Sequence, residues 1–187
     1  GLDPGYIKGY LPGVRENGGQ YTHAAIWASM AFAALGDAER ACELLGLIDP
    51  VGHSNSPQAA YVFRVEPYVV TGDVYAAEPH VGRGGWSWYT GSAGWMYRAI
   101  TESILGLRLE AGQLRIAPCI PKSWSGFEAT YRHVDTTYAI VVVQKAAAAV
   151  SMRISLDGEE QLEPVIALLD DGKTHRVDVA MTCVLAG

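Results

Sequence analysis

The pattern of apolar residues changes at Gly106, and this change constrains the fold of the 187-residue chain more than any other feature. Before Gly106, apolar residues recur at helical spacing, most clearly in the alanine-rich segment 21–35 and in segment 92–105. After it, short apolar runs alternate with turn residues such as Asp171-Gly172. We therefore predict an α+β chain, with a helical part over residues 1–106 and an all-β part over residues 107–187.

Turn and capping residues place the ends of the expected helices. Asp37 can accept a backbone hydrogen bond and so begin a helix directly after Gly36, where the preceding helix ends. Asp49-Pro50 ends the second helix, because the residue before a proline disfavours the helical conformation. We expect helices over residues 21–35, 38–47, 66–74 and 92–105, with loops over 51–58 and 76–87.

The part after Gly106 carries hairpin and strand signals. Leu107-Arg108-Leu109 and Leu114-Arg115-Ile116 flank Ala111-Gly112, a pattern typical of a β-hairpin. Short strands at regular spacing favour a β-sandwich. The helices of the first part are too few to close a helical barrel, so we expect a fragment whose missing helices come from upstream sequence or a partner chain. Further strands are expected over residues 127–133, 137–144, 151–156, 165–169 and 175–179.

Charge and composition argue against several classes of function. The formal net charge is −6 and the chain has no basic run, so we expect no nucleic-acid partner. The three cysteines lie far apart without a CxxC pair, which favours a reducing compartment over a disulfide framework. No apolar run approaches the roughly 20 residues of a spanning helix. The histidines of the helical part lack ligand spacing, so we expect no metal site.

Two polar segments stand directly before expected helices. One ends in His23 and the other in Thr90-Gly91. The start of a helix presents unpaired N–H groups and the positive end of the helix dipole, so it suits an anion. His23, the Thr90 hydroxyl and the Gly91 amide can each donate to a phosphate oxygen. The alternatives are a His23 that bonds a local carbonyl, and an ordinary N-cap at Thr90 or Ser92. If the two helices run parallel, His23 and Thr90 converge on one anion.

The same segments carry candidate sugar-binding groups. Glu16 can bind sugar hydroxyls, Arg15 can bind sugar or phosphate, and Tyr10 can stack on a sugar face. The alternatives are a surface ion pair between Arg15 and Glu16, and an aromatic side chain that belongs to the core. No local pattern marks the other carboxylates of this half as acids of raised pKa; these are Glu66, Asp73 and Glu78.

Several motifs together resemble the inverting carbohydrate phosphorylases, glycoside hydrolase family 94. They are Arg15-Glu16-Asn17-Gly18-Gly19 with His23, Val65-Glu66-Pro67-Tyr68-Val69, Trp88-Tyr89-Thr90-Gly91-Ser92-Ala93-Gly94-Trp95 and Ile104-Leu105-Gly106-Leu107. Gly5-Tyr6-Ile7-Lys8-Gly9-Tyr10 and Trp88-Tyr89-Thr90-Gly91 are most similar to the β-1,2-glucan branch, which includes cyclic β-1,2-glucan synthases and 1,2-β-oligoglucan phosphorylases. The resemblance covers about residues 5–130.

The resemblance implies the end of an (α/α)6 barrel over residues 1–106 and a C-terminal β-sandwich over residues 107–187. His23, Thr90 and the Gly91 amide match the phosphate-binding positions of the family, whereas Tyr10, Arg15 and Glu16 match positions near the bound sugar. The general acid of the family is an aspartate of an earlier barrel segment, so we expect no catalytic residue in this chain. Phosphate is a substrate, and no cofactor is expected.

These features together predict the C-terminal part of an inverting β-glucan phosphorylase, inactive alone, that converts a β-glucoside and phosphate to α-glucose 1-phosphate. Its expected partners are a β-glucan oligosaccharide, phosphate and the upstream part of the same barrel. A second copy of the chain, forming a homodimer, is a further possible partner. One alternative is a chain-length-controlling region of a cyclic β-1,2-glucan synthase, and another is a non-catalytic carbohydrate-binding or assembly module. We expect a cytoplasmic location, with membrane attachment if the parent is the synthase.

Overall fold

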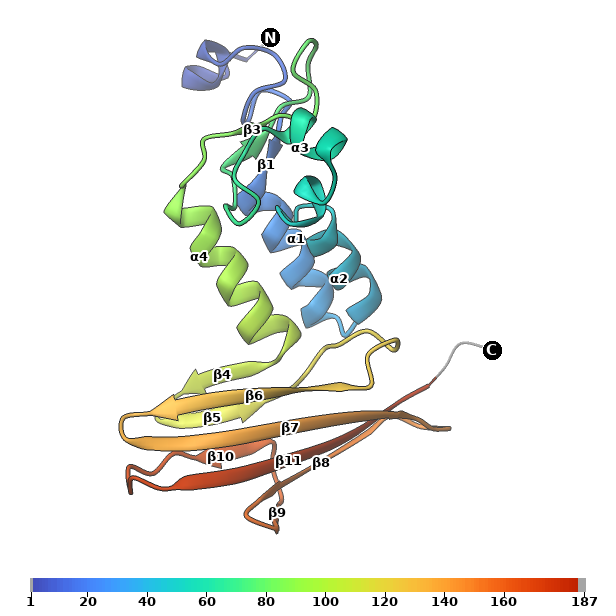
Figure 1. Ribbon diagram of the computed structural model, residues 1–187, viewed down its shortest axis with the longest axis vertical. Coiled ribbons are helices and arrows are strands. Elements are labelled where there is room, and N and C mark those ends of the chain that lie inside the picture. The colour runs from blue at the N-terminus through green and yellow to red at the C-terminus, as the bar shows by residue number, and fades with distance from the viewer. Residues whose placement is uncertain (1, 185–187) are drawn as a thin grey trace. The chain divides into compact units, whose positions relative to one another are not determined.

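The computed structural model describes residues 2–184 and divides the chain into two compact units, Gly1–Ile100 and Thr101–Gly187. Figure 1 shows helices in the first unit and strands through most of the second. Within residues 2–184, no helix combines the length and apolar character that crossing a membrane requires. The elements of the first unit are η1 (Gly5–Gly9), β1 (Gln20–Tyr21), α1 (Thr22–Ala34), α2 (Ala38–Gly46), η2 (Gly52–Ser54), α3 (Pro57–Phe63), β2 (Asp73–Val74), β3 (Gly84–Gly85) and α4 (Thr90–Arg98).

The predicted helices at 21–35, 38–47 and 92–105 are confirmed as α1, α2 and α4, the last continuing into the π-helix η3 (Ala99–Ile104). Asp37 caps α2 by accepting the Arg40 N–H at 3.0 Å. The Ser29 hydroxyl of α1 donates to the Ala41 carbonyl of α2 at 2.8 Å, which joins the two helices. The buried core between α1 and the last helical segment is formed by Ile26, Met96 and Ala99.

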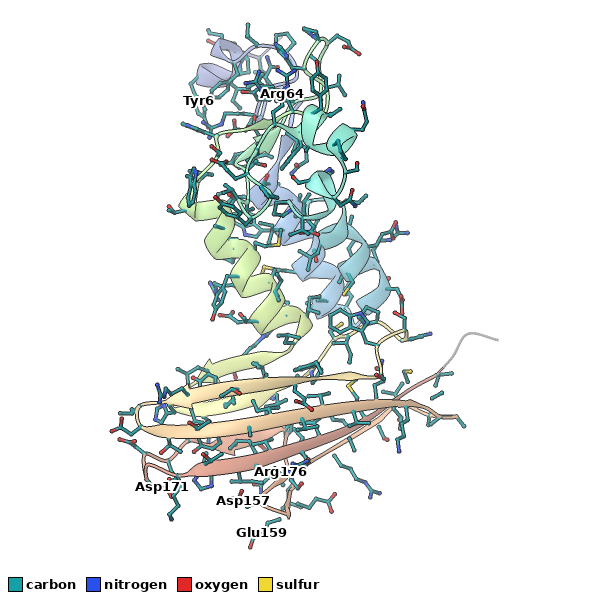
Figure 2. All side chains as sticks on the ribbon, in the orientation of Figure 1. Tyr6, Arg64, Asp157, Glu159, Asp171 and Arg176 are labelled. Atoms are coloured by element: carbon teal, nitrogen blue, oxygen red, sulfur yellow. The ribbon has the colours of Figure 1, made fainter. Side chains whose placement is uncertain are left out.

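Two sequence predictions for the middle of this unit are wrong. Residues 57–63, in part predicted as loop, form α3, because Ser56 caps the helix and Pro57 occupies its first turn. The helix ends where Arg64, labelled in Figure 2, adopts a left-handed conformation with φ 55°. Residues 66–74 form no helix: their last two residues pair as strand β2, a non-local interaction that outweighs the local helical pattern.

The small sheet β1-β2-β3 connects the segments that lead into α1 and α4. Asp73 of β2 pairs with Tyr21 on one side and with Gly85 on the other. Tyr21 directly precedes α1, and Gly85 directly precedes the segment that leads to α4. The first N–H of α1, from Thr22, donates to the Gly72 carbonyl at 3.0 Å. This sheet therefore sets where the starts of both helices lie.

The second unit contains two sheets, of strand order β10-β5-β4 and β6-β7-β11-β8-β9. The predicted hairpin is confirmed: β4 and β5 pair in antiparallel fashion, and left-handed Ala111 and Gly112 form the turn. All neighbouring strands pair antiparallel except β7 and β11, which are parallel. The strands are β4 (Leu107–Glu110), β5 (Gln113–Ile116), β6 (Gly126–His133), β7 (Thr136–Ala146), β8 (Ser151–Leu156), β9 (Glu159–Gln161), β10 (Val165–Ala167) and β11 (Thr174–Cys183).

One hydrophobic core lies between these two sheets. It combines Leu114, Ile116 and Ile166 of the smaller sheet with Tyr138, Ile140, Val142, Ile154, Val177 and Val179 of the larger one. A charged cluster lies where β11 begins and β8 ends in the larger sheet. His175 of β11 lies between two carboxylates, with Nδ1 2.7 Å from Asp157 and Nε2 3.2 Å from Asp171. Figure 2 labels both aspartates, which come from the β8–β9 turn and from the segment before β11.

Candidate functional site

His23 and Gly91 lie against each other, although they are 68 positions apart in the sequence. His23 is in the first turn of α1, and Gly91 is in the first turn of α4. A Cβ atom added at Gly91 would lie 2.9 Å from Nε2 of His23 and 3.0 Å from its Cε1. Only glycine gives the imidazole this space. The starts of α1 and α4 therefore converge, with one edge of the imidazole against the backbone of α4.

The two converging helix starts have no side-chain cap. Tyr21 and Tyr89 occupy the N-cap positions of α1 and α4, and neither side chain accepts a capping hydrogen bond from the backbone N–H groups of its helix. Thr90 is the first residue of α4, and Ser92 Oγ donates back to the Tyr89 carbonyl at 2.9 Å, so neither serves as the N-cap. By contrast, side chains cap α2 and α3. Apart from the Thr22 N–H, which donates to the Gly72 carbonyl, the first N–H groups of α1 and α4 are left without side-chain caps, and such groups suit an anion.

Aromatic rings hold the His23 imidazole in place. It stacks on Tyr21 at a centroid distance of 5.3 Å and packs against Tyr89 at 5.4 Å, with Trp27 edge-on at 6.2 Å. Its Nδ1 atom is buried and forms no hydrogen bond within the described residues 2–184. The alternative in which His23 bonds a local carbonyl is therefore not what the structure shows. The ring presents Nε2 to the Gly91 backbone.

Arg15 and Glu16 form a partly buried pair rather than a surface ion pair. Arg15 Nε lies 3.7 Å from Glu16 Oε2, and the two side chains are only 14% and 27% exposed. The Arg15 guanidinium lies over Trp86, 3.7 Å from the ring centroid, and is 5.2 Å from the centroid of Tyr10. Burial opposes the charge, but hydrogen bonds to neighbouring tyrosines outweigh it and leave the pKa of Arg15 raised. The guanidinium is thus a fixed cation.

A pocket of about 310 Å³ opens beside this guanidinium. Aromatic faces, a cation and a carboxylate in one hollow are the groups that bind the apolar faces and the hydroxyls of a sugar. Two of its lining residues have left-handed backbones without being glycine: Arg15 at φ 51° and Trp86 at φ 52°. Such strain concentrates at functional sites. The pocket is lined by Tyr10, Val14, Arg15, Asp73, Tyr75 and Trp86.

Asp73 is the site residue that sequence reasoning missed. It is 2% exposed, and its Oδ2 atom accepts the Arg15 N–H at 2.8 Å. Burial raises the pKa of Asp73, while the Arg15 N–H and the Arg15 charge oppose the shift. The sequence carries no local mark of this raised pKa, because the burial that causes it comes from the tertiary structure. No local sequence pattern marked Asp73, because its role depends on partners that are distant in the sequence.

Trp86 and Trp88 are exposed aromatic residues of the segment that leads into α4. Trp86 is 58% exposed, and Trp88 donates its indole N–H to Glu66 at 3.1 Å. Trp86 stacks on Tyr89 at 5.5 Å, which connects the Arg15 pocket to the aromatic rings around His23. Among residues 2–184, no group of three or more histidine, cysteine, aspartate or glutamate side chains could hold a metal ion. The described site therefore consists of the His23–Gly91 contact and the Arg15 pocket, joined through aromatic side chains.

Comparison with known proteins identifies the protein family to which the sequence is similar. Residues 1–106 match the model of the glycosyl hydrolase 94 superfamily, catalytic domain. The chain is 54% identical over 140 residues to the cyclic beta-(1,2)-glucan synthase NdvB of Rhizobium meliloti (strain 1021). These aligned residues make up 75% of the chain and 5% of that protein. It is 31% identical over 179 residues to the solabiose phosphorylase of Paenibacillus borealis, covering 95% of the chain and 23% of that enzyme.

A third relative is the N,N'-diacetylchitobiose phosphorylase of Vibrio furnissii, 36% identical over 141 residues, which cover 75% of the chain and 17% of that enzyme. The chain thus spans less than a quarter of the length of each of these relatives. Both the helical unit and the motifs around His23 and Gly91 fall inside the matched residues 1–106. The chain belongs to glycoside hydrolase family 94.

Proposed function

We propose that this chain is the C-terminal part of an inverting β-glucan phosphorylase and supplies the phosphate-binding half of its active site. One observation carries the proposal: the His23 imidazole lies against the Gly91 backbone where two helix starts without side-chain caps converge. This arrangement offers several donors and two positive dipole ends to one anion. Two relatives, named solabiose phosphorylase and N,N'-diacetylchitobiose phosphorylase, support a phosphate-dependent reaction.

In the proposed reaction, phosphate attacks the anomeric carbon from the face opposite the departing sugar. The glycosidic bond breaks as the new bond to the phosphate oxygen forms, and α-glucose 1-phosphate is released. Phosphate already carries charge, so it needs no catalytic base, unlike the water of an inverting hydrolase. The task of His23, Thr90 and the Gly91 amide is to hold the dianion in line for attack. The general acid that protonates the leaving oxygen is an aspartate supplied by an upstream segment.

The Arg15 pocket forms the sugar side of this site in the proposal. Tyr10 supplies an aromatic face, Arg15 supplies a fixed cation, and Glu16 supplies acceptors for hydroxyl groups. The guanidinium lies on Trp86, which in turn stacks on Tyr89 beside His23. The sugar and phosphate sites are therefore connected through packed rings. This connection supports one continuous site for a β-glucan oligosaccharide and phosphate, with no cofactor and no metal.

We also propose that residues 1–106 are the last helices of an (α/α)6 barrel and that residues 107–187 form a β-sandwich. The family match over residues 1–106 supports the first assignment, and the single core between two sheets supports the second. The upstream part of the barrel is then the main partner of this chain. An isolated chain without the general acid should not turn over substrate.

The similarity to NdvB supports a second candidate, a region of a cyclic β-1,2-glucan synthase that controls chain length. The two candidates share the β-1,2-glucan substrate and the phosphate site. They differ in product: a phosphorylase accumulates α-glucose 1-phosphate, whereas a chain-length region changes the size distribution of glucans made elsewhere in the protein. Analysis of both products from one incubation separates the candidates.

His23→Ala tests the proposed role directly in the chain combined with the upstream segment of its parent enzyme. We expect the KM for phosphate to rise by tenfold or more, because a charge-assisted hydrogen bond contributes about 1.5–3 kcal/mol. The KM for a β-1,2-gluco-oligosaccharide should change less than threefold. Steady-state kinetics with each substrate varied in turn measures both values. Equal losses for phosphate and sugar would contradict a phosphate-binding role for His23.

A further inference from the structure

Asp73 occupies the central position of the β1-β2-β3 sheet. Its backbone pairs with Tyr21, the residue before α1, and with Gly85, the residue before the segment that leads to α4. A Cβ atom at Gly85 would overlap Asp73 Oδ1, so glycine is what leaves room for the carboxylate. The side chain is buried, with the whole residue 2% exposed. A buried carboxylate at such a junction requires hydrogen-bond partners to offset its desolvation.

The partner that the structure gives this carboxylate is the backbone of Arg15. Asp73 Oδ2 accepts the Arg15 N–H at 2.8 Å, across 58 positions of sequence. Arg15 has φ 51°, a left-handed backbone conformation that a residue with a Cβ atom adopts only at a cost in conformational energy. A charge-assisted hydrogen bond from the same residue offsets that cost. Gly19 packs closely on this turn, since a Cβ atom there would lie 2.7 Å from Arg15 N.

The conformation of Arg15 decides where the groups of the sugar pocket lie. Its guanidinium reaches the face of Trp86, and Glu16 follows directly in the chain, with its carboxylate 3.7 Å from Arg15 Nε. A turn that relaxed to negative φ would redirect both side chains. We propose that Asp73 is a positioning residue that holds Arg15 and Glu16 in their sugar-binding arrangement through its hydrogen bond to the Arg15 N–H. This inference rests on the proposed function for the identity of the bound sugar.

Two variants of Asp73 separate the hydrogen bond from the charge. Asp73→Ala removes the acceptor, whereas Asp73→Asn keeps an acceptor oxygen for the Arg15 N–H and removes the charge. Asp37→Ala is a matched control, because Asp37 also accepts a backbone N–H, that of Arg40 at 3.0 Å, but caps α2 instead. All three variants are compared with the original chain, alone and combined with the upstream segment.

The first readout is amide hydrogen exchange at Arg15, followed by NMR in the chain alone. We expect exchange at least tenfold faster in Asp73→Ala, within about threefold of the original in Asp73→Asn, and unchanged in Asp37→Ala. The second readout is kinetic. In Asp73→Ala the KM for the oligosaccharide should rise at least tenfold, because a small displacement of binding groups has large effects, while the KM for phosphate changes less than threefold.

Unchanged exchange at Arg15 in Asp73→Ala would overturn the inference, as would equal losses in the KM for sugar and phosphate. If Asp73→Ala does not fold, Asp73→Asn tests the inference instead. An exchange rate at Arg15 and a KM for the oligosaccharide close to those of the original chain support the hydrogen-bond role, whereas a rise in both contradicts it. The exchange measurement requires no turnover. A combined enzyme without phosphorylase activity would therefore refute the proposed function, while exchange at Arg15 would still test whether Asp73 holds this turn.

Discussion

Replacing Gly91 with alanine tests whether the space between the two helix starts serves phosphate binding. The new methyl group would lie 2.9 Å from His23 Nε2, whereas ordinary contacts of a Cβ atom begin at 3.4 Å. The imidazole must therefore move by about half an ångström. It cannot swing away freely, because Tyr21 and Tyr89 pack against it. The donor nitrogen of His23 then leaves its position relative to the start of α4.

The expected magnitude follows from the hydrogen bond that is lost. A hydrogen bond to a charged group contributes about 1.5–3 kcal/mol, and about 1.4 kcal/mol corresponds to a tenfold change in affinity. We therefore expect Gly91→Ala to weaken phosphate binding by about tenfold to a hundredfold. Folding stability should change little, because alanine in a helix gains roughly 0.5–1 kcal/mol over glycine and so offsets part of the crowding.

Gly94→Ala is the matched control in the same helix. A Cβ atom at Gly94 would meet no atom within 4 Å, so this substitution carries the helix-propensity gain without crowding His23. Phosphate titration, followed through the His23 ring signals by NMR, measures affinity, and thermal unfolding measures stability. Phosphate affinity within twofold of the original in Gly91→Ala would show that the space at Gly91 does not serve phosphate binding. A loss in Gly94→Ala as large as that in Gly91→Ala would do the same.

Two further predictions concern the charged cluster and the sugar pocket. Asp157 and then Asp171 raise the pKa of His175 above its usual 6.5, so His175 contributes stability fully below pH 6.5 and loses it as the pH rises through the folded-state pKa. The melting-temperature difference between the original chain and His175→Gln should shrink between about pH 6 and pH 9; a constant difference would contradict this. Trp86→Ala removes the ring under the Arg15 guanidinium and should weaken oligosaccharide binding several-fold without affecting phosphate titration. If Trp86→Ala bound the oligosaccharide as tightly as the original chain does, a role for this stack in sugar binding would be refuted.

Local signals in the sequence were enough for the elements whose boundaries depend on neighbouring residues. Asp37 and Asp49-Pro50 predicted both ends of α2, because a cap and a proline act within a few positions. Ser56-Pro57 carried an equally local signal for α3, a cap followed by proline in the first turn, which the loop prediction overlooked. The hairpin at Ala111-Gly112 was likewise a local feature, and it was predicted correctly.

Features that depend on distant partners were beyond such reasoning. The helix predicted over residues 66–74 fails because Asp73 pairs with Tyr21 and Gly85, each of which lies more than ten positions away. The parallel pairing of β7 with β11 has the same origin. At the site, the residue types indicated an anion, and the convergence of His23 with the start of α4 was predicted only on the condition that the two helices run parallel; the structure places the imidazole beside Gly91. The role of Asp73 depends on a hydrogen bond across 58 positions, for which the sequence has no local pattern.

The most direct test of a split phosphorylase site is an activity assay with the chain alone and with its upstream segment co-expressed. Each preparation is incubated with β-1,2-gluco-oligosaccharides and inorganic phosphate, and α-glucose 1-phosphate is measured. We expect product only from the combined preparation, since the proposed general acid lies upstream and the proposed phosphate donors lie at His23, Thr90 and Gly91. Product from the chain alone, or no product from the combined preparation, would show that the site is not divided in this way.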